Sequence, residues 1–191
     1  MGLDILAATG LTRITQEEAN LIEESGEGGN VVYLHNAKQF EDRLRPTEDG
    51  VYTYDTTASF SFRAGSYSGY STYRDDLCGL IYQLPVEAIW AIADLPELNA
   101  EIVDFHNGDT HTQAVDFQPQ LHKLPFLEQL AFSDCEGALG LEVCTKLADD
   151  YEKFDELASR RFESYTYKVY QDFRGAFELV AGADDGAVVY G

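Results

Sequence analysis

The clearest pattern of apolar and polar positions lies in the last third of the chain. Apolar side chains recur there at intervals of three and four residues along two stretches, which is the period of a helix with one buried face. The first stretch comprises Leu141, Cys144, Leu147, Ala148, Tyr151, Phe154 and Ala158, and the second comprises Val169, Phe173, Ala176, Phe177 and Val180. The pattern predicts two helices packed side by side with a break near 161–164. A turn is expected at 182–186, followed by a final strand at 187–190.

Three more helices are predicted from their start and stop signals. Thr15-Gln16-Glu17-Glu18 has the sequence of a capping box, and Gly26 ends the helix that follows. A loop is expected at 65–69 and then a helix from about 70 to 82, because four apolar or aromatic residues there share one face: Tyr70, Tyr73, Leu77 and Ile81. A proline suits the first turn of a helix, so Pro85 favours a short helix over 86–93.

Strands are expected at 31–35 and within 51–62, where β-branched and aromatic residues dominate. Residues 99–123 fit a hairpin or a long functional loop. The predicted fold class is α+β, with a small mixed or antiparallel sheet flanked by helices and a helical C-terminal third. Since no linker rich in Gly, Ser or Pro divides the chain, residues 1–191 are expected to form a single domain, in which 1–60 is a less typical portion.

Composition adds a strong acidity to this picture. The 191 residues include 34 Asp and Glu against 13 Lys and Arg, a net charge of -21, and 45% are hydrophobic. The apolar content supports a folded core, and the charge opposes direct binding to nucleic acids or anionic membranes. Three interpretations of the acidity stay open: a strongly hydrated surface, adaptation to high salt, and a decoy that mimics DNA and binds a basic protein partner.

The expected location is the cytoplasm. No basic segment followed by a long apolar run marks the N-terminus as a targeting signal, and no stretch is apolar enough to span a membrane. The three cysteines, an odd number, favour reduced thiols. The helical Cys144 is expected in the core.

The segment 62–74 is a cationic island in this acidic chain. Residues 61–80 carry two bases and two acids, whereas 81–136 carry one base and ten acids. Arginines can hold a phosphate or carboxylate, serines can donate hydrogen bonds or cap a helix, and tyrosines can stack on a ring. The candidate ligand-binding residues are Arg63, Ser66, Tyr67, Ser68, Tyr70 and Arg74. The alternative is a strand–turn–helix junction whose arginines pair with Asp75, Asp76 or other acids.

A second segment, 104–111, contains two imidazoles and two carboxylates. His106, Asp109 and His111 are candidate ligands for a divalent metal such as zinc or manganese. The alternative is a polar hairpin that turns at Asn107-Gly108. Together with Asp134, these residues support a metal-dependent hydrolase as an alternative function, so the sequence is compatible with both an enzyme and a binding protein.

The third segment, Phe132-Ser133-Asp134-Cys135-Glu136-Gly137, precedes the first C-terminal helix. Cys135 with His122 would form a nucleophile pair, but an acidic neighbourhood raises a thiol pKa and opposes this role. Asp134 and Glu136 are better candidates, as metal ligands or as partners of the two arginines.

Three stretches together resemble a family of small proteins of bacteria and their phages for which no activity is established. They are Phe-Arg-Ala-Gly-Ser-Tyr-Ser-Gly-Tyr at 62–70, Phe-Ser-Asp-Cys-Glu-Gly at 132–137 and Phe-Arg-Gly-Ala-Phe-Glu-Leu at 173–179. The resemblance covers roughly 60–191. It implies no catalytic residues, but it favours the first two stretches as parts of one site and implies a phage-derived protein that acts on host defence. The expected function is binding of an anionic, nucleotide-like small molecule.

Overall fold

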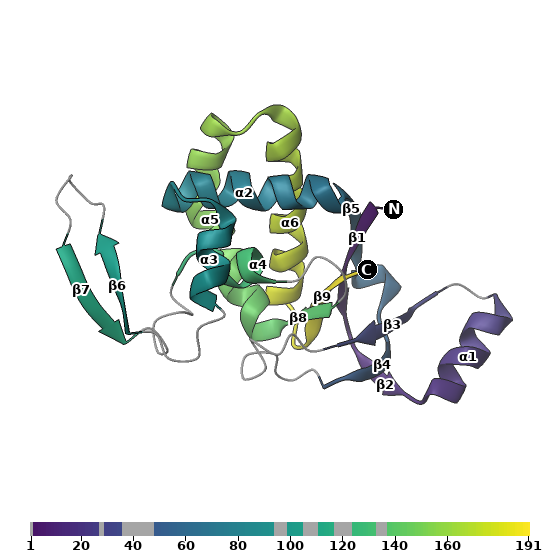
Figure 1. Cartoon of the computed structure of the whole chain (residues 1–191). Coiled ribbons are helices and arrows are strands. Elements are labelled where there is room, and N and C mark those ends of the chain that lie inside the picture. The colour runs from purple at the N-terminus through teal and green to yellow at the C-terminus, as the bar shows by residue number, and fades with distance from the viewer. Residues whose placement is uncertain are drawn as a thin grey trace.

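We describe the fold from a computed structural model. It describes residues 2–26, 29–35, 48–93, 99–104, 111–116, 124–132 and 137–191. Figure 1 shows the arrangement of the elements along the chain.

A four-stranded antiparallel sheet forms the centre of the molecule. Its strands lie in the order β5 (Phe60–Ser66), β1 (Gly2–Thr9), β9 (Gly186–Tyr190) and β8 (Gly137–Gly140). β1 therefore pairs on one side with a strand 50 or more residues away and on the other with the last strand of the chain. The sheet joins the two ends of the described chain.

Helices cover one face of this sheet. They are α2 (Tyr67–Tyr82), α3 (Val86–Ala93), α4 (Leu127–Ala131), α5 (Leu141–Arg161) and α6 (Ser164–Ala181). Successive side chains of a strand point to opposite faces. Leu3, Ile5 and Ala7 of β1 accordingly join the large core beneath the helices, whereas Leu6 packs into a smaller cluster on the other face.

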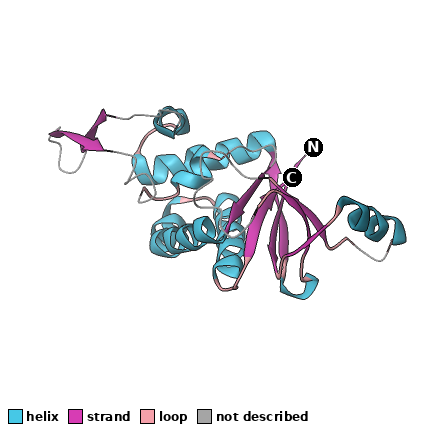
Figure 2. Ribbon diagram, turned by 90° about the horizontal axis from the view of Figure 1, so that it is seen from below, coloured by secondary structure: helices cyan, strands magenta, loops and turns pink. Residues whose placement is uncertain are grey.

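A second, three-stranded antiparallel sheet lies against that other face. It contains β2 (Thr12–Ile14), β4 (Gly50–Thr53) and β3 (Val31–Leu34) in this order, and α1 (Gln16–Ser25) is attached to it. The apolar residues between the sheets are Val32, Leu34, Tyr52, Ala138 and Ala187, joined by Leu6, Leu11, Tyr54 and Val189. Figure 2 shows the strands between the helical layer and the isolated α1.

The chain crosses from β1 to β2 at Gly10. Its backbone has a φ of 65°, a conformation that glycine adopts without steric cost. The N–H groups of Gly10 and Leu11 both donate to the Asp185 carboxylate, at 2.7 and 3.1 Å. These hydrogen bonds connect the β1–β2 link to the turn that precedes β9.

One more pair of strands, β6 (Asn99–Asp104) and β7 (His111–Asp116), forms an antiparallel hairpin. Asp104 lies opposite His111 in its register. The hairpin interpretation of this stretch is confirmed for these strands, and the predicted turn at 107–108 lies outside the described residues.

The predicted fold class is confirmed, and the sheets are antiparallel rather than mixed. The capping box at Thr15 and Glu18 and the αL conformation of Gly26 are also confirmed. The predicted loop at 65–69 is wrong, because β5 runs directly into α2 with Ser66 as the N-cap. In the described part of the chain, no helix is both long and apolar enough to cross a membrane.

Candidate functional site

The cationic segment forms the junction between β5 and α2. Ser66 has an extended backbone, and its hydroxyl accepts a hydrogen bond from the N–H of Gly69 at 3.1 Å. The hydroxyl of Ser68 lies 3.0 Å from that of Ser66. Serine is a favoured N-cap residue, so Ser66, a candidate ligand donor, also explains why α2 begins here.

Arg63 lies on the exposed surface of this junction. Its side chain is 63% exposed, and its Nε is 3.9 Å from a carboxylate oxygen of Asp4, which is its register partner on β1. The guanidinium lies across Gly2, where a Cβ would come within 2.0 Å of Nε. The glycine therefore allows the side chain to lie flat against β1, and the ion pair with Asp4 is long and solvated.

Tyr165 of α6 reaches the same junction, and sequence reasoning missed it. Its hydroxyl lies 3.2 Å from where a Cβ of Gly65 would stand, and Gly65 has a φ of 101°. Tyr165 is 65% exposed, which is unusual for so large a ring. The sequence signal was an aromatic residue off the apolar stripe of its helix, but only the tertiary structure shows that it lies beside the cationic segment.

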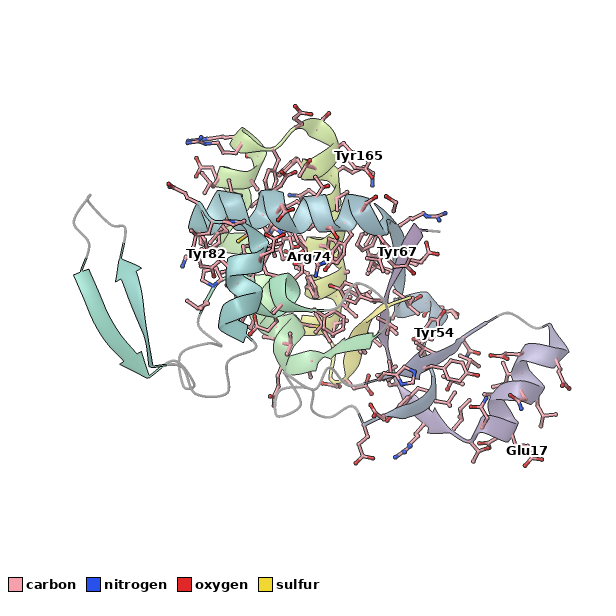
Figure 3. The ribbon with its side chains drawn as sticks, in the orientation of Figure 1. Glu17, Tyr54, Tyr67, Arg74, Tyr82 and Tyr165 are labelled. Carbon is pink, nitrogen blue, oxygen red and sulfur yellow. The ribbon has the colours of Figure 1, made fainter. Side chains whose placement is uncertain are left out.

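The second half of the segment points inward. Arg74 is buried, and its Nη1 donates to the carbonyl of Phe132 at 2.6 Å. Its guanidinium carbon lies 4.9 Å from the centre of the Tyr70 ring, which is itself completely buried against Tyr73, Phe173 and Tyr190. Figure 3 shows Tyr67 at the beginning of α2 and Arg74 beneath its middle. Position 74 follows Tyr70 by four residues, so the helical period already placed it on the buried face.

The structure therefore separates the predicted ligand-binding residues into two groups. Arg63, Ser66 and Ser68 are exposed at the junction, Tyr67 is half-buried, and Tyr70 and Arg74 belong to the interior. The contact with Phe132 brings the start of the third segment to Arg74. Asp134, Cys135 and Glu136 themselves lie outside the described residues.

Most of the candidate metal ligands lie outside the described residues. His106, Asp109 and His122 lie outside the described residues, and His111 is described only through the backbone of β7. Within the described ranges, no group of three His, Cys, Asp or Glu side chains is placed to hold a metal ion. The metal-dependent hydrolase stays a prediction.

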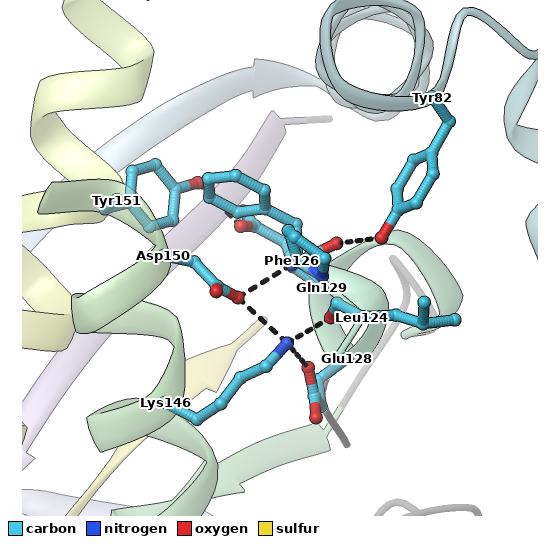
Figure 4. A network of polar contacts seen from close by, with 9 residues as sticks. Tyr82, Leu124, Phe126, Glu128, Gln129, Lys146, Asp150 and Tyr151 are labelled. Carbon is cyan, nitrogen blue, oxygen red and sulfur yellow. Dashed lines mark hydrogen bonds and ion pairs between the residues drawn. The ribbon is translucent and has the colours of Figure 1, made fainter. Parts of the chain in front are cut away.

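A charged cluster joins α4 to α5. It is formed by the buried Glu128 and Asp150 and the half-buried Lys146. Lys146 Nζ contacts Glu128 Oε2 at 2.6 Å, Asp150 Oδ2 at 2.8 Å and the carbonyl of Leu124 at 2.5 Å (Figure 4). The same Asp150 oxygen accepts the N–H of Phe126 at 2.7 Å. The helical spacing of α5 could have predicted this cluster, because Asp150 lies three residues after Leu147 on the buried face of the helix.

The cluster holds the chain at 124–128 in place. Burial raises the pKa of Asp150, while Lys146 and the N–H of Phe126 act in the opposite direction. Removing one member of a buried ion pair leaves an uncompensated charge and typically costs about 3–5 kcal/mol. Since Arg74 holds Phe132, both ends of the stretch 124–132 are bound to helices by charged side chains.

Beside this cluster, hydrogen bonds among Gln129 and two tyrosine hydroxyls form a polar network inside the core. Tyr151 donates to Gln129 Oε1 at 2.6 Å and lies 2.8 Å from the hydroxyl of Tyr73. Burial raises the pKa of both tyrosines well above the ordinary value, so they stay protonated. Burial likewise raises the pKa of Cys78 to about 12, and Cys144 is buried as predicted. Neither thiol has the character of a nucleophile.

Comparison with known proteins adds no relative. No family model, no curated protein and no solved structure matches this chain.

Proposed function

We propose that the protein binds an anionic small molecule at the junction of β5 and α2. The ligand-binding residues would be Arg63, Ser66 and Ser68, which the sequence indicated, together with Tyr165. The observation that carries the proposal is the exposed guanidinium of Arg63, which lies over Gly2, the register partner of Ser66 at the start of a 16-residue helix.

The charge arrangement supports an incoming anion. An ion pair between two exposed side chains contributes little to stability, and Arg63 and Asp4 are 3.9 Å apart and both exposed. A phosphate or carboxylate can therefore replace Asp4 as the partner of Arg63 at small cost. Arginine also offers two parallel N–H donors, which suits planar or tetrahedral oxyanions.

The beginning of α2 supplies further donors. The first N–H groups of a helix have no acceptor within the helix, and the Ser66 hydroxyl already serves that of Gly69. The N–H groups of Tyr67 and Ser68 and the hydroxyl of Ser68 lie on the same turn. The positive end of the helix dipole adds to the attraction of an anion there.

Tyr165 favours a ligand that carries a ring as well as an anionic group. An exposed tyrosine ring can stack on a nucleobase, and its hydroxyl can bond to a sugar or phosphate. A nucleotide-like ligand combines these features. The resemblance to bacterial and phage proteins suggests a signalling nucleotide of host defence, since a protein of phage origin would gain by binding one.

The test is a melting-temperature screen of the full chain against nucleotides, cyclic dinucleotides, sugar phosphates and inorganic phosphate. A ligand present at about 100 times its Kd should add about 2.7 kcal/mol of stability and a clear upward shift. Arg63→Ala should remove the shift without lowering the melting temperature of the unliganded protein.

Arg160→Ala is the matched control, because Arg160 is an exposed arginine that also pairs with a carboxylate, that of Glu156. It should leave the shift intact. Arg74→Ala does not suit this purpose, because the loss of a buried guanidinium would destabilise the fold itself. No shift with any compound, or equal loss in both variants, would contradict the proposal.

A further inference from the structure

The helix α1 buries little of its surface against the rest of the described chain. It contacts the second sheet through one fully buried residue, Ala19, with Ile22 half-buried beside it. In Figures 1 and 2 it lies at the far end of that sheet, away from the other helices. Most of its surface is therefore open to another molecule.

An apolar side chain lies in the middle of the open face. Leu21 is 61% exposed. Residues three and four positions apart are neighbours on a helix surface, so Glu17, Glu18 and Glu24 surround it at positions i−4, i−3 and i+3. Figure 3 shows Glu17 on the outside of the helix. The face thus combines one apolar projection with a border of carboxylates.

The carboxylates of this face differ in how the fold uses them. Glu18 accepts from the N–H and the hydroxyl of Thr15, and Glu23, on the inner side, accepts from Tyr33 at 3.3 Å. For Glu17 and Glu24, the described residues contain no ion-pair partner. No lysine or arginine occurs in 16–25. Among the described residues, this negative charge is therefore left without a compensating cation.

We infer that α1 is a docking face for a basic protein partner whose surface has an apolar pocket bordered by lysines and arginines. Leu21 would enter the pocket, and Glu17 and Glu24 would face the cations. Charge complementarity selects this occupant. A second copy of the chain carries the same net charge of -21 and the same acidic face, so self-association through α1 is opposed by repulsion. This inference is independent of the proposed anion site.

The test uses defined peptides and the full-length chain. The probe is a synthetic amphipathic helical peptide with leucines on one face bordered by lysines, labelled for fluorescence anisotropy. Two matched peptides replace the leucines by serines or the lysines by glutamates. Only the first should bind, and its affinity should fall as salt rises from about 50 to 300 mM.

The variant Leu21→Gln keeps helix propensity and removes the apolar side chain. It should weaken binding by about tenfold or more, the effect of losing one buried leucine. The pair Glu17→Gln and Glu24→Gln should weaken binding and reduce its salt dependence. Matched controls on α5 are Leu157→Gln, where the leucine is 37% exposed, and the pair Glu142→Gln and Glu152→Gln.

Three results would overturn the inference. The first is no binding of the leucine–lysine peptide at a concentration about 100 times the Kd typical of specific complexes. The others are equal binding of the serine peptide and equal losses of binding in the α5 control variants. Sedimentation velocity completes the test, because a dimer lost in Leu21→Gln would assign the face to self-association instead.

Discussion

At the scale of single residues, charge decides where side chains act in this protein. The two arginines of the cationic segment 62–74 have opposite environments. Arg63 lies over Gly2 and is exposed to solvent, whereas Arg74, on the buried side of α2, donates to the carbonyl of Phe132. Buried charges carry a large desolvation cost and are kept by several polar contacts. The buried arginine thus has a structural role in holding Phe132, and the exposed one is the arginine that we propose binds a ligand.

The pH dependence of stability should reveal the buried carboxylate Asp150. Burial raises its pKa in the folded protein above that of the unfolded chain. Its contribution to stability is therefore present below the ordinary pKa and is lost as pH rises through the raised value. Asp150→Asn keeps an acceptor for the N–H of Phe126, so its free energy of unfolding should fall less steeply over this pH range.

Urea denaturation at a series of pH values measures this slope. Asp149→Asn removes the same charge from an exposed neighbour and should keep the slope of the original protein. Burial also raises the pKa of Asp76, so some slope should persist in Asp150→Asn. Identical slopes in the original protein and Asp150→Asn would show that this carboxyl is not perturbed.

At the scale of elements, local signals and tertiary packing contribute unequally to different helices. α5 and α6 pack along their length and need no special start, as neither N-cap residue makes a side-chain capping bond. α1 buries little and depends on its ends: the reciprocal bonds of Thr15 and Glu18 and the αL glycine at 26. Short helices in water are marginal without such support.

Thr15→Ala should therefore loosen α1 selectively. The loss of the capping hydroxyl is expected to cost about 1 kcal/mol, which for a peripheral helix appears as local opening. Hydrogen exchange of the amides in 19–25 should accelerate about fivefold, as 1 kcal/mol corresponds to roughly this factor.

Thr145→Ala provides the comparison, because Thr145 is exposed within α5 and bonds only to the carbonyl of Leu141 in its own helix. There alanine should be neutral or slightly stabilising. Unchanged exchange of α1 in Thr15→Ala would show that packing on the second sheet, and not the cap, holds this helix.

At the scale of the whole molecule, the fold places an aromatic core beneath an acidic surface. The largest buried side chains include Tyr70, Tyr151, Tyr170, Phe173 and Phe177. Their burial supplies the favourable free energy that offsets repulsion among the surface carboxylates. A core of this size should hold the fold even where that repulsion is least screened.

The melting temperature should consequently rise with sodium chloride between about 20 and 500 mM, and the protein should already be folded at the lowest salt. The Debye length falls below the spacing of surface charges in this range, so the effect should level off at the upper end. Circular dichroism melts measure it. A chain that is unfolded at low salt and recovers only above about 1 M would instead support adaptation to high salt.

The sequence alone determined the elements whose information is local. The helices over 16–25, 86–93 and the C-terminal pair follow from a capping box, a proline and apolar periodicity, and the structure confirms them. The strand at 31–34 is also confirmed. Each of these patterns can be recognised within a window of a few turns, because hydrogen bonds and helix faces connect near neighbours.

The tertiary structure alone decided which distant residues meet. β1 escaped prediction because its stability comes from β5 and β9, and β8 because its four residues, Gly137–Gly140, have little strand propensity of their own. Tyr165 reached the cationic segment, and Lys146 met Glu128, across gaps that no local pattern spans. The cationic stretch therefore has an exposed half and a buried half, because the direction of a side chain depends on which face of its strand or helix packs against the rest of the fold.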